Sequence, residues 1–194
     1  VKEVGEMNNV DCQTFLVVVN FMAEGFSRMD GSADDISIPA LVDYLRQAHI
    51  YFLDYCLPAI RRKLIEAIDC SQDDVSFLIL KFFDGYMREV RKHMEYEEKT
   101  VFKYVDTLIH GNAPKNYQIS TFSKHHDQVG ERLTELKNII IKYCPAKANT
   151  NVLNAALFDI YACEEGLESH CKVEDYLFVP AILKLERRMR ENEK

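Results

Sequence analysis

Four long stretches of this chain repeat apolar residues every three or four positions, over roughly 37–68, 73–109, 117–143 and 151–183. This period is that of an amphipathic α-helix with one buried face. Each stretch is long enough for about seven turns or more. Short segments join them, so consecutive helices run in opposite directions. The sequence therefore predicts an all-α fold, an antiparallel four-helix bundle with up-down-up-down topology.

Signals at the helix ends support these boundaries. Ser37 is a candidate N-cap for the first helix. Gly111 and Pro114 form a stop signal after the second, because glycine accepts a left-handed conformation and proline cannot continue a helix. Pro58 and Pro180 lie inside the first and fourth stretches, where the missing N–H group predicts a kink. The last residues, from position 184 onward, read as a solvated charged end.

Residues 1–36 have a different organisation and are predicted to form a helical appendage with a linker. Val1–Met7 fits a short helix, and Asp11 is a candidate N-cap for the apolar run that follows. The small and acidic residues at 31–35 indicate a linker. We expect the appendage either to pack on the main body or to be the remainder of a small domain. The bundle itself is assigned to residues 37–194.

Composition and charge narrow the partners and the compartment. The formal net charge of −7 disfavours nucleic acid and anionic membranes, because both bind basic surfaces. No apolar run reaches the ~18 residues of a membrane-spanning helix. The six cysteines include no C-x-x-C pair and lie mostly within helical patterns. We therefore expect reduced thiols and a cytoplasmic location.

Two copies of one short spacing stand out on the helical stripes. His93 and Glu97 are four residues apart on the second helix, and His170 and Glu174 repeat this spacing on the fourth. Side chains four residues apart project from one helix face, about one turn from each other. Each pair is therefore arranged to chelate a metal ion.

The first and third helices each add a histidine to their apolar stripes, His49 and His126. Counted at 1.5 Å per residue from the connecting loops, the histidines of neighbouring helices lie at similar heights in an antiparallel bundle. These two residues and the two pairs are thus expected in one layer of the core. The predicted site residues are His49, His93, Glu97, His126, His170 and Glu174.

Metal binding explains why such residues would lie inside a bundle. Each buried charge would cost several kcal/mol if unpaired, and like charges repel. Mixed imidazole and carboxylate ligands suit iron, manganese or zinc, whereas a structural zinc site usually contains thiolates. Six ligands are too many for one ion with an open position. We infer two ions bridged by Glu97 and Glu174, with iron favoured and manganese or zinc as substitutes.

Other residues are weaker candidates for site chemistry. His125 is expected behind the ligands or at the surface, Cys163 in the packing, and Cys171 beside the fourth-helix ligands as a candidate redox thiol. No glycine-rich phosphate loop or nucleophile elbow is present. Whether the chain is an enzyme stays open, with a metal-binding repair or sensor protein favoured over a conventional enzyme. Four tyrosines are core residues by default and secondary candidates for orienting ligands: Tyr51, Tyr86, Tyr104 and Tyr176.

The segments that carry these residues resemble the hemerythrin-like (HHE cation-binding) domain. The similarity covers about 39–186 and rests on His49 with Leu57-Pro58, and on residues 93–102, 126–133 and 170–180. Within that family, the pattern is nearest to the di-iron proteins that repair iron centres under nitrosative and oxidative stress. The resemblance implies a non-haem di-iron site with the four histidines as terminal ligands and the two glutamates as bridges.

The resemblance has a second part and two departures. Residues 1–16 resemble the end of the small cysteine-bearing domain that precedes the bundle in such repair proteins, whose cysteine pair would lie before Val1. Val129 stands where relatives often have a second histidine, and Lys103 where many have proline. The departures leave the predicted ligands intact and bear on the repair activity.

The resemblance implies two alternative functions. The first is iron–sulfur cluster repair or a response to nitric oxide and oxygen stress, with oxygen, nitric oxide and damaged iron–sulfur proteins as partners. The second is a sensory domain for oxygen, nitric oxide or redox state within a larger regulatory protein. Oxygen carriage or iron storage is less favoured, because the pattern is nearer to the repair proteins.

Overall fold

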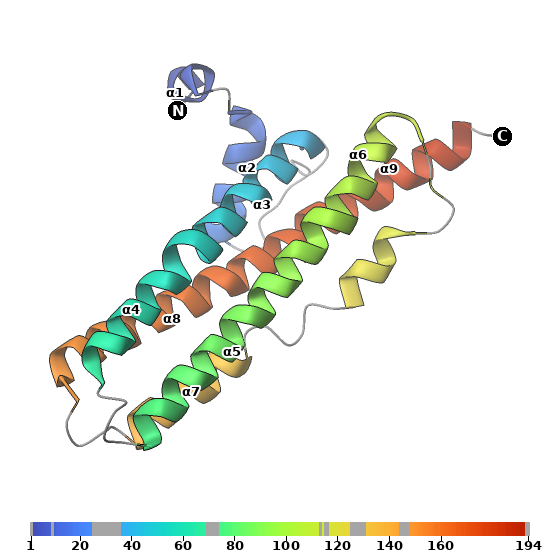
Figure 1. The fold of residues 1–194 in the computed structure, drawn as a ribbon. Helices are drawn as coiled ribbons and strands as arrows, with labels where there is room; N and C mark the ends of the chain where they lie inside the picture. Colours follow the sequence, from blue (N-terminus) through green and yellow to red (C-terminus); the bar gives the residue numbers. More distant parts are fainter. Residues whose placement is uncertain are drawn as a thin grey trace. The chain divides into compact units, whose positions relative to one another are not determined.

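The computed structural model describes residues 2–8, 10–24, 36–68, 74–112, 114, 117–124, 131–143 and 148–192. In this part of the chain the regular structure is helical and no strand occurs (Figure 1). The prediction of an all-α fold is confirmed. None of these helices is long and apolar enough to cross a lipid bilayer.

The helices follow one another with few long connections, and Figure 1 labels the α-helices in chain order. The shorter π-helical and 3-10 segments are named η in the text and carry no label in Figure 1. The bounds are α1 Lys2–Met7, α2 Cys12–Glu24, α3 Ile38–Ile50, η3 Tyr51–Cys56, α4 Leu57–Ala67, α5 Asp74–Tyr96, η4 Glu97–Val101, α6 Phe102–Ile109, η5 Ile119–Lys124, α7 Glu131–Lys142, α8 Thr150–Val173, η6 Glu174–Phe178 and α9 Val179–Asn192.

The chain divides into two compact units. Unit 1 contains Val1–Gln47, Glu97–His126 and Ser169–Lys194, and unit 2 contains Ala48–Tyr96 and Asp127–Glu168. Three helical runs are continuous along the chain, namely α3–η3–α4, α5–η4–α6 and α8–η6–α9.

Among the described residues of unit 2, the helices α4, α5, α7 and α8 form a ring. Ion pairs link α4 to α5 and α8, and link α7 to the same two helices. Ion pairs on exposed helix faces add little stability, but all four pairs show which helices are neighbours. The backbone N–H of Asn149 donates to the carbonyl of Ala67, which brings the start of α8 to the end of α4. The ion pairs are Arg61–Asp84, Lys63–Asp159, Arg132–Glu89 and Lys137–Glu164.

The apolar stripes of these helices meet in the core of unit 2, as the periodicity predicted. The stripe residues Ile60, Leu64, Val90, Leu136 and Ile160 are each at most 1% exposed. Burying one aliphatic side chain of this size contributes about 1.5–3 kcal/mol. The interior of unit 2 is therefore held mainly by residues that the sequence pattern identified.

Two glycines in unit 2 offer a matched test of this packing. A Cβ atom added to Gly166 would lie 3.3 Å from two ring atoms of the buried Phe52, whereas one added to Gly85 would meet only the tip of Arg88 at 3.8 Å. We expect Gly85→Ala to raise the free energy of unfolding by about 0.5–1 kcal/mol through helix propensity. Gly166→Ala should lower it by about 1 kcal/mol, because overpacking outweighs the same gain. Urea unfolding followed by circular dichroism measures both, and equal stabilisation would contradict the close contact.

Three predicted helix ends are confirmed. The backbone N–H of Thr14 donates to Oδ1 of Asp11 at 2.8 Å, so Asp11 caps α2. The backbone N–H of Ala40 donates to Oγ of Ser37 at 3.4 Å at the start of α3. Gly111 has a φ of 82° just after α6, a conformation that glycine adopts without strain.

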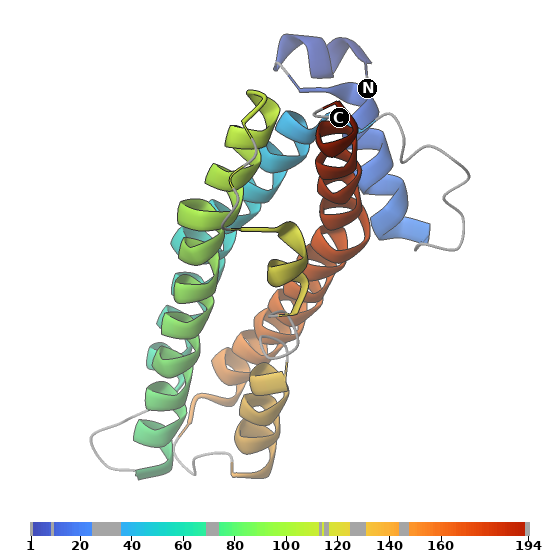
Figure 2. The same cartoon turned by 90° about the vertical axis from the view of Figure 1, so that its right-hand side faces the viewer.

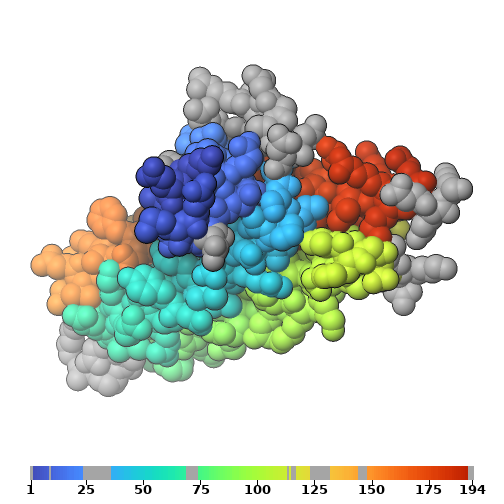
Figure 3. All heavy atoms as spheres, turned by 90° about the horizontal axis from the view of Figure 1, so that it is seen from above, coloured from blue at the N-terminus to red at the C-terminus, as the bar shows by residue number. Residues whose placement is uncertain are grey.

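In unit 1 the N-terminal helix α2 contacts α3. The backbone N–H of Ser37 donates to Oγ1 of Thr14 at 2.9 Å, and the Tyr44 hydroxyl contacts the Met22 sulfur at 3.4 Å. Figure 3 shows α2 in blue beside α3 in light blue. The linker at 31–35 lies outside the described residues.

Each of the three long helical runs contains one π-helical turn. η3 ends two residues before Pro58 and η6 two residues before Pro180. A π-helical turn spaces its hydrogen bonds more widely, which suits a proline that lacks an N–H group and crowds the preceding turn. Lys103 holds the corresponding place after η4, so proline is not required for such a turn. The predicted kink positions thus coincide with widened turns, and the helix continues beyond each of them.

The third predicted helix, 117–143, is wrong as a single α-helix. Residues Ile119–Lys124 form the 3-10 segment η5, and α7 begins at Glu131 (Figure 2). Three of the six η5 residues are serine or threonine, whose side chains compete for backbone hydrogen bonds and lower α-helix propensity. His125 and His126 lie outside the described residues.

Candidate metal centre

Three of the predicted ligands lie together in unit 1. Glu97 follows α5 directly, and His170 and Glu174 are one turn apart at the end of α8 and the start of η6. The Nε2 atom of His170 lies 3.5 Å from Oε1 of Glu174. The i, i+4 spacing therefore brings the imidazole and the carboxylate together, as the helical pattern predicted.

A fourth predicted ligand, His49 near the end of α3, completes this group. His49, Glu97, His170 and Glu174 each offer one ligand atom, and these atoms lie within 4.8 Å of one another. All four side chains are buried, and both glutamates are 0% exposed. Nitrogen and oxygen ligands at such separations can be spanned by a metal ion with bonds of about 2.0–2.2 Å.

The two carboxylates make the site strongly acidic inside an apolar surrounding. Burial, and then the neighbouring charge of Glu97, raise the pKa of Glu174 well above its ordinary value. Both effects disfavour the ionised form, since water is excluded and like charges repel. A bound cation offsets both costs. The burial and the composition of this group therefore fit a cation site.

Two further side chains respond to the same charge. Burial and the Glu174 carboxylate raise the pKa of Tyr44 on α3. Burial, followed by the charges of Glu174 and Glu97, raises the pKa of Cys171, so this residue remains a neutral thiol. The candidate redox role of Cys171 gains no support from this environment. Tyr44 was not among the predicted site residues, although it lies on the His49 helix little more than one turn away.

The three π-helical turns begin at or next to these ligands. Glu97 is the first residue of η4, Glu174 is the first residue of η6, and η3 starts two residues after His49. Isolated π-turns inside α-helices are frequent at functional sites because they change the direction of side chains. Hydrophobic periodicity carries no clear signal for such a turn, and the sequence did not predict them.

The remaining predicted residues are placed as follows. His93 is half-buried on α5, with its Nε2 atom shielded from solvent, and it lies outside the four-residue group. His126 lies outside the described residues, so its role as a ligand stays a prediction. Of the four candidate tyrosines, Tyr104 bonds Glu186, and Tyr176 packs on Phe21.

Comparison with protein families agrees with this site. Residues 40–182 match the model of one protein family, the hemerythrin HHE cation-binding domain. The matched range contains all six predicted ligands and the three π-helical turns. A comparison with curated proteins gave no match. Since the family covers most of the chain, and a buried histidine and glutamate cluster lies within it, the chain belongs to the hemerythrin HHE cation-binding family.

Proposed function

We propose that this protein holds a non-haem di-iron centre and serves in iron–sulfur cluster repair or in the response to nitric oxide and oxygen stress. The observation that carries the proposal is the pair of fully buried glutamates beside two buried histidines. Two adjacent carboxylates are suited to bridge two cations, since each has two oxygens and together they supply two negative charges. His93 and His126 are proposed to complete the ligand set.

The protein residues have defined roles in this proposal. Glu97 and Glu174 would hold the ions in place, and His49 and His170 would bind as neutral imidazoles. When bound, iron supplies open coordination positions for a diatomic ligand and a change of oxidation state. Without a metal ion, burial and the nearby carboxylates raise the pKa of the neighbouring Cys171 thiol.

Metal content and repair activity test the proposal in sequence. Protein from iron-replete cells should contain two iron ions per chain by mass spectrometry. The iron-loaded protein should change its absorption spectrum on exposure to nitric oxide, and it should restore activity to a dehydratase whose iron–sulfur cluster has been damaged. Absence of iron would contradict the metal assignment. A full iron complement without reactivation of the dehydratase would contradict the repair role alone.

A further inference from the structure

Unit 2 contains two cysteines whose side chains face each other from different helices. Cys56 is the last residue of η3, and Cys163 lies on α8. Their thiols are joined by a side-chain hydrogen bond. Both are free cysteines. The two thiols are thus neighbours, and a disulfide, with an S–S bond of about 2.05 Å, would require the sulfurs to approach further.

The two cysteines differ in ways that matter for reactivity. Cys163 is 2% exposed and belongs to the core of unit 2. Cys56 is half-buried at the edge of that core. A reagent from solvent therefore reaches Cys56 first, and Cys163 is positioned behind it.

The groups around Cys56 favour its thiolate. Hydrogen bonds from Cys163 and Tyr51 lower the pKa of the Cys56 thiol against the opposing effects of burial and of Asp159, and the bond from Cys163 is the largest contribution. That same bond, together with burial, raises the pKa of Cys163. Tyr51 and Cys56 are the first and last residues of the π-helical turn η3. The thiolate is the reactive form of cysteine.

We propose that Cys56 and Cys163 form a redox-active dithiol that hydrogen peroxide oxidises to a disulfide. The Cys56 thiolate attacks one peroxide oxygen and the O–O bond breaks, which gives a sulfenic acid on Cys56 and a hydroxide ion that solvent protonates to water. The Cys163 sulfur then attacks the Cys56 sulfur. The S–O bond breaks, and the leaving hydroxide takes the Cys163 proton as a second water. Two thiols lose two electrons and one peroxide becomes two waters.

The position of the pair gives its oxidation a structural consequence. Cys56 lies seven residues after His49 along one helical run, and Cys163 lies seven residues before His170 on α8. The disulfide would tie together two helices that also carry candidate metal ligands, about two turns from each ligand. The dithiol chemistry needs no metal. A failure of the di-iron proposal would therefore leave the dithiol proposal unchanged, and the reverse also holds.

Peptide mapping of the full-length protein tests the proposal. The protein is titrated with hydrogen peroxide, its remaining thiols are alkylated, and a non-reducing digest is analysed by mass spectrometry. We expect one linked peptide pair containing Cys56 and Cys163, and its loss after treatment with dithiothreitol. Recovery of both residues as alkylated thiols, at a peroxide dose that oxidises Cys12, would overturn the proposal. A disulfide from Cys56 to a different cysteine would overturn it as well.

Single substitutions separate the roles of the two thiols. In Cys163→Ala, oxidation should stop at the sulfenic acid of Cys56, which dimedone traps as a stable adduct. In Cys56→Ser, Cys163 should stay alkylatable at the same peroxide dose. Cys12→Ser, a change in unit 1, is the matched control and should leave the linked pair at the wild-type yield. A dimedone adduct on Cys163 in Cys56→Ser would assign the first attack to the wrong residue and contradict the mechanism.

Discussion

Replacing Glu174 with glutamine should lower the iron content of the purified protein at least tenfold while leaving the bundle folded. Glutamine keeps the shape of the side chain but removes one of two buried negative charges, and an amide cannot bridge two cations as a carboxylate does. Mass spectrometry of the metal content and circular dichroism of the same preparation measure the two parts of this result.

The same substitution should stabilise the protein once metal is removed. In chelator-treated wild type, Glu97 and Glu174 stay buried side by side, and burial together with the Glu97 charge raises the pKa of Glu174. Removing one of two like charges relieves that conflict, and we expect the free energy of unfolding to rise by about 2 kcal/mol. Urea unfolding in the presence of chelator provides the measurement.

Glu98→Gln is the matched control, because Glu98 is the chain neighbour of Glu97 but points to the surface. It pairs with Arg46 at 3.2 Å, and both side chains are more than a third exposed. We expect unchanged iron content and a stability change within about 0.5 kcal/mol. Retention of two iron ions by Glu174→Gln would show that Glu174 is not a ligand. Loss of iron in both variants would show that the loss is not specific to Glu174.

Sequence periodicity was sufficient for the parts of this protein that depend on helix phase. The stripe that contains Ile160 also contains His170 and Glu174, so one count along the helix predicts both the core face and the direction of the ligands. The grouping of these residues with His49 and Glu97 then needed only the loop lengths and the rise per residue. The regular geometry of the α-helix and the short connections between helices were therefore enough to predict the core faces and the grouping of these four ligands.

Sequence periodicity did not predict the π-helical turns or the contact between Cys56 and Cys163, because both depend on local backbone geometry. The turns η3, η4 and η6 change the phase of a helix by a fraction of a turn, which a search for a fixed period averages out. The side-chain contact between Cys56 and Cys163 depends on the rotation of two helices about their own axes. That rotation is set by packing in unit 2, and the π-helical turn η3, which ends at Cys56, alters it.

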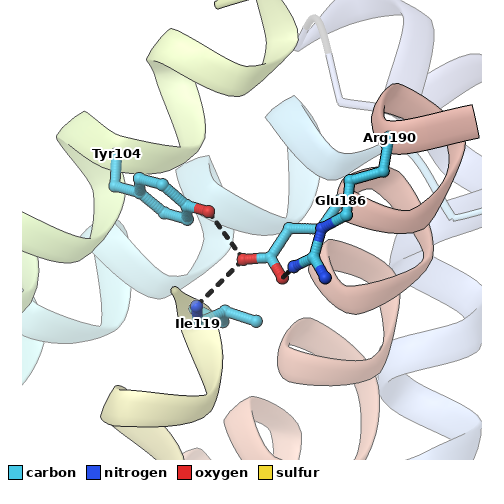
Figure 4. A network of polar contacts seen from close by, with 4 residues as sticks. All are labelled: Tyr104, Ile119, Glu186 and Arg190. Atoms are coloured by element: carbon cyan, nitrogen blue, oxygen red, sulfur yellow. Dashed lines mark hydrogen bonds and ion pairs between the residues drawn. The ribbon is translucent and has the colours of Figure 1, made fainter. Parts of the chain in front are cut away.

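The C-terminal residues show that a prediction from residue type alone can be wrong. Residues from 184 onward were predicted to be a solvated charged end, yet α9 extends to Asn192 and Glu186 is only 5% exposed. The residue type misled the prediction, because glutamate is rarely buried unless it is paired. In unit 1, Glu186 has partners from three elements. The Tyr104 hydroxyl on α6, the Ile119 N–H on η5 and the Arg190 guanidinium on α9 all donate to it (Figure 4).

Replacing Glu186 with leucine should therefore lower the free energy of unfolding by roughly 3 kcal/mol, because a buried hydroxyl and a buried N–H lose their acceptor at a cost of about 1–3 kcal/mol each. The hydrogen bonds from Tyr104 and Ile119 to Oε1 measure 2.6 and 2.9 Å. Glu186→Gln keeps that oxygen as an acceptor and is the matched control, with an expected loss of about 1 kcal/mol or less. Urea unfolding at neutral pH compares the two variants, and equal losses would contradict the role of the acceptor.

The pH dependence of stability reports on the environment of Tyr104 within this network. Burial, and then the bond to Glu186, raise the pKa of Tyr104 above its ordinary value of 10.0. The unfolded chain therefore releases this proton at a lower pH than the folded chain. The stabilisation is fully present below pH 10 and is lost as the pH rises through the folded pKa. Tyr104→Phe should flatten the fall in unfolding free energy above pH 10 by up to about 1.4 kcal/mol per pH unit, the slope of one titrating group.

The double variant tests whether Tyr104 and Glu186 are coupled. Because the bond is absent in Glu186→Leu, adding Tyr104→Phe to that variant should change the alkaline slope by less than it does in wild type. An equal change in both backgrounds would mean that the two residues are not coupled.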